Sequence, residues 1–144
     1  MAELANGAGL YYGSDGVSYS ELPDLASMTS AGSPTYADVD VTPLKPTDDT
    51  RSFERGLRDS GEFQFRQYWT AARLDTLKDL EEDGDNLYWR ITYPDDTTPT
   101  LASKTEFRGR IKAVVEPSFD DPETPLIITV TVKVNSRPVF TPKS

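Results

Sequence analysis

Alternating apolar and polar residues in the second half of the chain constrain its fold more than any other feature. Every second residue is apolar or glycine over residues 87–93, 107–115 and 126–134, and mostly charged or hydroxyl residues lie between them. Side chains of a β-strand point to opposite faces in turn, so this period of two predicts three strands with one buried face each. A shorter alternation around Phe63 and Phe65 predicts a fourth strand. One polar face per strand is typical of antiparallel sheets.

One segment, residues 70–82, is expected to form a helix. Its apolar residues recur every third position as Ala71, Leu74, Leu77 and Leu80. Thr70 is placed to cap the first turn, and Gly84 is placed to end the helix in a left-handed conformation. The run Asp83-Gly84-Asp85-Asn86 also hints at a calcium loop, but its glycine comes too early for an EF-hand. A helix end is therefore favoured over a metal site.

The N-terminal third gives weaker signals. Gly13-Ser14-Asp15-Gly16 separates two short apolar segments, which predicts a β-hairpin over residues 10–19. Residues 38–42 alternate like a half-buried strand that Pro43 ends, whereas residues 25–36 show no clear pattern. The chain is therefore expected to form an antiparallel β-sandwich or barrel with one flanking α-helix.

Residues 43–61 are expected to form a long loop. They carry two prolines, two glycines and eight charged residues, and sustain neither a period of two nor one of 3.6. Loops of this length in compact domains are usually functional or disordered. Phe53 and Leu57 lie in this charged setting, which suggests that a partner buries them.

Composition excludes most catalytic machinery. The 144 residues include no cysteine and no histidine, so there is no disulfide, thiolate zinc site, cysteine nucleophile or imidazole base. A glycosidase needs only a pair of carboxylates, for which Glu62, Glu106 and Glu116 are the first to test. Most acids, however, lie in turns or beside basic residues, as on solvated surfaces. We expect no enzyme, cofactor or metal.

The charge of the chain is acidic, with a formal net charge of -9. Phosphate-binding surfaces need clustered basic residues, so tight nucleic-acid binding is disfavoured. Arg108, Arg110 and Lys112 would share one strand face, and pairing with acids on adjacent strands or on another subunit is favoured over nucleic-acid contact. No secretory signal or long apolar stretch is apparent, so we expect synthesis in a cytoplasm and no membrane contact.

The order of segments along the chain resembles the major tail tube proteins of long, non-contractile-tailed bacteriophages, of the lambda tail tube type. The segments are 9–13, 19–25, 38–42, 51–63, the helix, 89–95, and 127–134 followed by Arg137-Pro138. The resemblance implies a virion protein whose homohexameric rings stack into a hollow tail tube for genome ejection. It implies as partners a tape measure, a tail terminator, a baseplate, and double-stranded DNA that passes without tight binding.

Within a single tail-tube-like domain over residues 1–144, we expect a flexible N-terminal arm (1–9), an assembly loop (43–61) and a C-terminal tail (137–144). Contacts between subunits or rings are assigned to Arg51, Phe53, Arg55, Leu57, Arg58, Asp59 and Trp69. The thin core and the acidic balance suit an oligomeric conduit through which DNA slides.

Two alternatives remain. One is a monomeric carbohydrate- or protein-binding β-sandwich module that uses Trp69 or exposed tyrosines as its platform. The other is a tail-end ring protein of the same fold that does not polymerise. Assembly separates them, because only a tube subunit forms long hollow rods.

Overall fold

The computed structural model describes residues 7–30, 35–42, 44, 51–98 and 100–143, and these residues form one helix and two antiparallel sheets. The helix is α1 (Ala71–Asp83). The strands are β1 (Gly9–Gly13), β2 (Ser20–Glu21), β3 (Leu25–Met28), β4 (Thr35–Asp40), β5 (Phe53–Asp59), β6 (Glu62–Tyr68), β7 (Leu87–Thr92), β8 (Lys104–Val115), β9 (Ile127–Val134) and β10 (Val139–Thr141).

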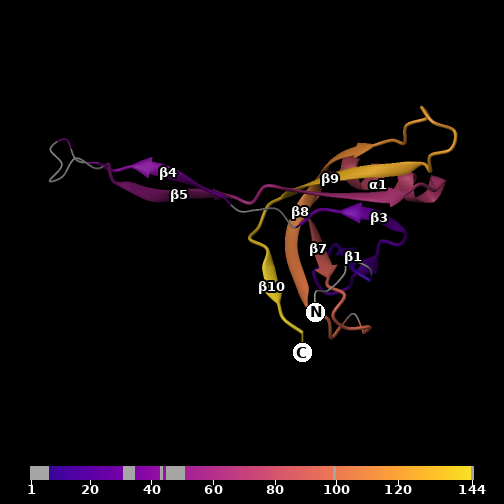
Figure 1. Cartoon of the computed structure of the whole chain (residues 1–144), viewed down its shortest axis with the longest axis horizontal. Helices are drawn as coiled ribbons and strands as arrows, with labels where there is room; N and C mark the ends of the chain where they lie inside the picture. Colours follow the sequence, from indigo (N-terminus) through magenta and orange to yellow (C-terminus); the bar gives the residue numbers. More distant parts are fainter. Residues whose placement is uncertain (1–6, 31–34, 43, 45–50, 99, 144) are drawn as a thin grey trace.

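The main sheet has the strand order β2-β1-β7-β8-β9-β6-β3, and β10 pairs with the first part of β8. β2 and β3, at opposite ends of this order, are joined only by residues 22–24, so the sheet has to curl back on itself (Figure 1). Among the described residues these two strands share no ladder, and the sheet stays open. The expected antiparallel architecture with one flanking helix is confirmed, without closure into a barrel.

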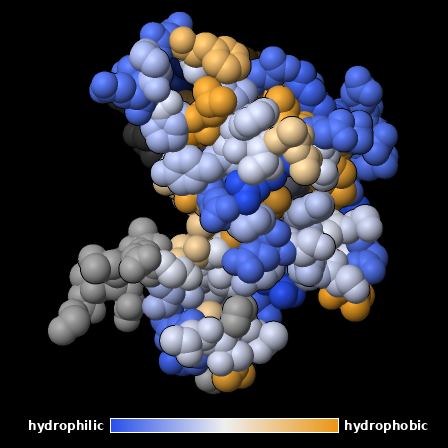
Figure 2. Space-filling model, turned by 90° about the vertical axis from the view of Figure 1, so that its right-hand side faces the viewer, coloured by the Kyte–Doolittle hydropathy of each residue, from blue (hydrophilic) through white to orange (hydrophobic). Residues whose placement is uncertain are grey.

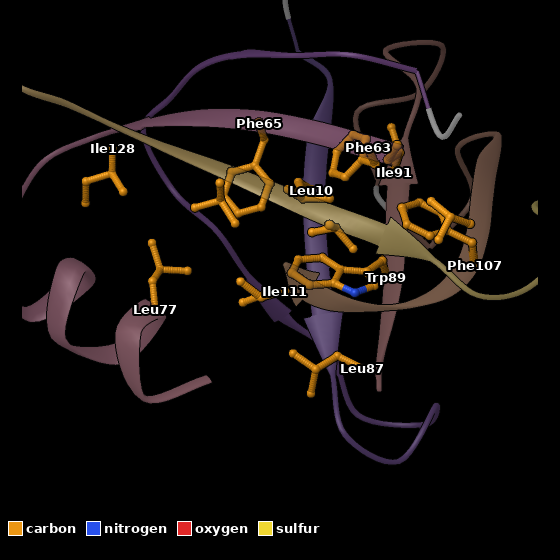
Figure 3. Packing of buried hydrophobic residues seen from close by; sticks show 13 residues of the cluster. Leu10, Phe63, Phe65, Leu77, Leu87, Trp89, Ile91, Phe107, Ile111 and Ile128 are labelled. Atoms are coloured by element: carbon orange, nitrogen blue, oxygen red, sulfur yellow. The ribbon is translucent and has the colours of Figure 1, made fainter. Parts of the chain in front are cut away.

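The curled sheet encloses an aromatic and aliphatic core (Figure 3). Trp89 of β7 is fully buried, and its ring centroid lies 5.9 Å from that of Phe65 on β6, although β8 and β9 lie between these strands in the sheet order. The Trp89 Nε1–H donates to the Gly109 carbonyl oxygen at 3.0 Å, which satisfies the polar atom of the indole. Trp89 therefore lies on the buried face that the sequence predicts for this strand.

Helix α1 begins and ends as the sequence predicts. The Thr70 Oγ1 accepts a hydrogen bond from the Arg73 N–H at 3.2 Å, and Gly84 has a φ of 66° in the left-handed region. Leu77 is buried against the core, and Leu74 and Leu80 are partly buried beside it. The helix therefore packs on the core and against β8, with an apolar stripe narrower than predicted because Ala71 is exposed.

Removal of the helix cap gives a first testable effect. We expect Thr70→Ala to lower the free energy of unfolding by about 1 kcal/mol, because the Arg73 N–H loses its acceptor. Thr70→Ser keeps a hydroxyl acceptor and is expected to lie close to wild type. Urea denaturation followed by circular dichroism measures both variants, and equal stabilities would contradict the role of the cap.

A β-bulge changes which residues of β8 face the core. The register shifts between Ile111 and Ala113, so that Ala113 lies opposite Thr131 and Val114 lies opposite Val130. Val114 then packs against the core, and Val115 is 55% exposed. The predicted apolar face over residues 107–115 is wrong beyond Ile111, because the extra residue of a bulge reverses the alternation.

Three N-terminal predictions also need correction. β1 pairs with residues 20–21 rather than 17–19, because the Asp15 carboxylate accepts the Val17 and Ser18 N–H groups in a turn. β3 was not predicted. β4 covers residues 35–40 and is exposed throughout, not half-buried, because it pairs only with β5.

The expected loop over residues 43–61 is wrong in its second half, since residues 53–59 form β5. Residues 43 and 45–50 lie outside the described part of the chain. Phe53 and Leu57 are the large apolar residues of β5, and charged Arg55 lies at the alternate position between them, so the sequence shows no period of two there. The expected C-terminal tail contains β10, and the expected N-terminal arm ends where β1 begins, at Gly9.

Candidate assembly surface

Strands β4 and β5 form a two-stranded ribbon, here called the assembly hairpin (residues 35–42 and 51–59). It projects away from the main sheet (Figure 1). Pairing runs from Thr35 opposite Asp59 to Asp40 opposite Phe53, and the Val41 N–H continues it by donating to the Ser52 carbonyl at 2.9 Å. An isolated two-stranded hairpin is marginally stable in water. We therefore expect the assembly hairpin to need stabilising contacts beyond its own backbone hydrogen bonds.

Local interactions hold the register of the assembly hairpin. The Arg55 guanidinium lies over the Tyr36 ring, 4.2 Å from its centroid. A bulge in β5 places Gly56 and Leu57 opposite Ala37, and a Cβ on Gly56 would lie 2.9 Å from the Ala37 carbonyl oxygen. Glycine at position 56 therefore lets the two strands approach at the bulge.

Large apolar side chains of the assembly hairpin are open to solvent. Leu57 is 91% exposed and Phe53 is 56% exposed. Tyr36, Val39 and Val41 on the facing strand are exposed as well. An isolated exposed leucine is ordinary, but this number of apolar side chains on one projecting element is typical of a protein–protein contact.

The base of the assembly hairpin is fixed by the Asp59 carboxylate. Its Oδ1 accepts the Gly61 N–H at 2.9 Å and the Lys133 ammonium at 3.2 Å, and Gly61 turns the chain with a φ of 78°. The Val134 N–H donates to the Gly61 carbonyl oxygen, which ties the turn to β9. The hydrogen bond from Gly61 first, and Lys133 second, hold the pKa of Asp59 below its ordinary value.

This contact predicts an acid-dependent signal. Because the folded-state pKa of Asp59 is lowered, its stabilisation is present above the unfolded pKa of about 3.9 and is lost as pH falls through the folded value. We expect the Gly61 amide resonance to titrate below that unfolded value, and Lys133→Ala to raise the midpoint. An NMR pH titration of dispersed subunits measures both midpoints. An unshifted midpoint in both proteins would contradict the arrangement.

The sequence-predicted contact residues fall into two groups. Arg51, Phe53, Arg55, Leu57 and Asp59 lie on the assembly hairpin, where the Arg51 guanidinium is 3.6 Å from the Asp40 carboxylate. Arg58 is opposite Tyr36 in register, and its side chain lies outside the described part of the structure.

Trp69 lies apart from these residues, after the far end of β6. Its backbone N–H donates to the Leu126 carbonyl oxygen. It is 39% exposed. Figure 2 looks at the end of the molecule that carries α1 and shows a mostly hydrophilic surface with separate apolar side chains. The structure therefore does not join Trp69 to the assembly hairpin in one subunit.

The basic row on β8 divides into paired and unpaired members. The Lys112 Nζ lies 2.5 Å from a Glu62 carboxylate oxygen. Within the described residues, Arg108 and Arg110 form no ion pair. The Arg108 guanidinium instead lies over the Tyr88 ring, 4.8 Å from its centroid.

The three carboxylates tested as catalytic candidates each face a base. Lys112 lowers the pKa of Glu62, whereas a general acid needs a raised one. Glu106 pairs with Arg90, and Glu116 with Lys78. Across the described ranges, no group of three or more acidic residues is arranged to hold a metal ion. Nor is any described helix long and apolar enough to cross a membrane.

Sequence reasoning missed the apolar residues of β4. Tyr36 lies in the segment without a pattern, and Val39 and Val41 looked like the buried face of a strand. A second exposed apolar group was also missed: Phe140 of β10 packs edge-on against Tyr93 at 5.6 Å, beside exposed Val139. The sequence carried one signal of this exposure. Aspartates alternate with the valines, and a solvated two-stranded ribbon shows this pattern as readily as a half-buried strand does.

Solved structures share this fold over nearly the whole chain. A chain of the PVC extracellular contractile injection system, in its sheath–tube complex, has a TM-score of 0.74 at 12% identity, covering 98% of this chain and 92% of that one. A chain of the tail of the gene transfer agent particle has a TM-score of 0.70 at 14% identity, covering 97% and 99%. A chain of the SPP1 tail tube has a TM-score of 0.65 at 11% identity, covering 99% and 80%. The chain therefore has the tail tube fold.

No protein-family model matches the sequence, and no curated protein is significantly similar to it. The likeness is thus one of structure at identities where sequence comparison fails.

Proposed function

We propose that this chain is a structural subunit of a tail tube, in which rings of identical copies stack into a hollow conduit. The observation that carries the proposal is a projecting hairpin whose apolar side chains have no partner in the described part of the subunit, on a domain with the tail tube fold. The subunit has a complete core of its own. The exposed apolar side chains of the hairpin are therefore not needed for the core, and they are available for contacts between subunits.

Open strand edges support ring formation. In the described structure, β2 and β3 end the main sheet, and the assembly hairpin presents two more outer edges. Uncovered edges of this kind pair non-specifically with strands of other chains and cause aggregation. A closed ring of subunits covers them in the plane, and a head-to-tail contact through the hairpin then extends the assembly along an axis.

The finer proposal is a homohexameric ring in a non-contractile tail of the lambda type, with DNA passing through the lumen during ejection. The ordered segments from residues 9–13 to 127–134 support the lambda type. The tail of the gene transfer agent particle was determined with C6 symmetry, which supports six subunits. Location in a virion tail, synthesis in the host cytoplasm, and contacts with a tape measure, a terminator and a baseplate follow from this role.

A second candidate is a ring protein that ends a tube. Another chain with this fold, at a TM-score of 0.76, belongs to the tube-terminating cap of the anti-feeding prophage. Such a subunit would form a ring but would not stack indefinitely. The assembly hairpin favours the tube, since an exposed apolar ribbon on every copy provides a contact that repeats.

Light scattering over a concentration series tests the two candidates. A tube subunit is expected to show a critical concentration above which the mean mass keeps rising. A terminating ring is expected to reach one fixed mass and stay there. A fixed mass of several subunits at every concentration would exclude the tube and support the second candidate.

A further inference from the structure

The outer surface of the main sheet carries a cluster of basic side chains, here called the basic face: Arg108, Arg110, Lys112 and Lys133. The first three lie on β8 and the fourth lies on β9. They point away from the core because their neighbours Phe107, Ile111 and Val132 are buried. The net charge of -9 is therefore not spread evenly, since this surface is positive.

Local carboxylates neutralise only part of the basic face. Lys112 pairs with Glu62 across β9, and Lys133 pairs with Asp59 at the base of the assembly hairpin. Arg110, which is exposed, faces none of the carboxylates in the described structure within ion-pair distance.

The strand register also brings two basic side chains of the basic face close together. Arg110 lies directly opposite Lys133 in the antiparallel ladder between β8 and β9. Like charges in directly opposed positions destabilise a sheet. Asp59 and Glu62, which lies opposite Lys133 on β6, offset the charge of Lys133, so the charge left without a counterion is that of Arg110.

The geometry of the basic face suits phosphate. Arginine donates two parallel N–H groups to one phosphate, and Arg108 and Arg110 are two residues apart on a strand, about 6.8 Å along one line.

We propose that the basic face contacts the phosphate backbone of duplex DNA through Arg108 and Arg110. The inference rests on the proposed function for the source of the DNA, the genome that passes through the tube, and it turns the outer surface of β8 and β9 toward the lumen. The contacts are few, so binding is weak and lost in salt. Such contacts guide a duplex without holding it.

Fluorescence anisotropy of a short labelled duplex tests the proposal, with subunits kept dilute enough to remain dispersed. With two phosphates contacted, the logarithm of the affinity should fall with the logarithm of salt concentration at a slope of about -2. Arg110→Glu is expected to weaken binding at least tenfold, by about 1.4 kcal/mol, and to flatten the slope by about 1. Lys78→Glu on helix α1 makes the same change in net charge and is expected to retain most of the affinity.

Two results would overturn the inference. Equal losses in Arg110→Glu and Lys78→Glu would show an effect of net charge alone. Loss of rod formation by Arg110→Glu at unchanged DNA affinity would make the basic face a contact between subunits. Rod formation by the wild-type protein is scored in the same preparation, so a failure of the proposed function is recognised separately from a failure of the basic face.

Discussion

Leu57→Asp is expected to abolish rod growth while leaving the subunit folded. The Leu57 side chain is 91% exposed, so the free subunit loses almost no buried surface and its stability should change by no more than about 0.5 kcal/mol. In a stacked contact, a buried leucine contributes about 1.5–3 kcal/mol, and a carboxylate in its place adds a desolvation cost. The critical concentration should therefore rise at least about a hundredfold. Phe53→Asp should act in the same way.

Val17→Asp is the matched control for this experiment. Val17 is also an exposed aliphatic residue, at 83%, but it lies in the turn between β1 and β2. Circular dichroism checks the fold, and electron microscopy measures rod number and length at equal concentrations. Rods of normal length from Leu57→Asp, or equal loss from Val17→Asp, would exclude the assembly hairpin as the stacking surface.

Trp89→Ala is expected to cause the largest loss of subunit stability, about 3–5 kcal/mol. Trp89 is fully buried, and its ring contacts those of Phe65 and Tyr12. Truncation leaves a cavity where β1, β6 and β7 meet. Since domains of this kind are stable by about 5–15 kcal/mol, much of the folded population should be lost at moderate urea concentrations.

Two variants separate the packing of Trp89 from its hydrogen bond. Trp89→Phe keeps an aromatic ring but leaves the Gly109 carbonyl oxygen without its donor, at an expected cost of about 1–3 kcal/mol. Trp69→Ala removes the other tryptophan, which is partly exposed, and should cost clearly less than Trp89→Ala. Equal urea midpoints for Trp69→Ala and Trp89→Ala would contradict the assignment of the core.

Strands that border the core were predictable from the sequence, because burial of one face imposes a period of two on the side chains. β9 follows this period from end to end, and β7 follows it as far as Ile91, after which Thr92 is buried and Tyr93 is exposed. Helix α1 was predictable at both ends because Thr70 and Gly84 act through local geometry. β8 was predictable only as far as its bulge, since an inserted residue leaves no mark in composition.

The assembly hairpin was not predictable as a ribbon, because it borders no core in the subunit. With both faces of β4 exposed, burial selects no alternation, and Gly56 reflects a close approach at the bulge rather than a loop. Phe53 and Leu57 were nonetheless identified as contact candidates, because large apolar residues in a charged segment have no place in the core of the subunit and so indicate burial by a partner. The unpaired state of Arg110 depends on the register with β9, which the sequence does not state.

Negative-stain electron microscopy of the purified protein at rising concentration, beside size-exclusion chromatography of the same samples, tests the central claim most directly. We expect uniform hollow rods with a regular axial repeat, which lengthen as concentration increases. A subunit that elutes at 16.0 kDa at every concentration, with no rods or rings on the grid, would contradict a tube-forming role.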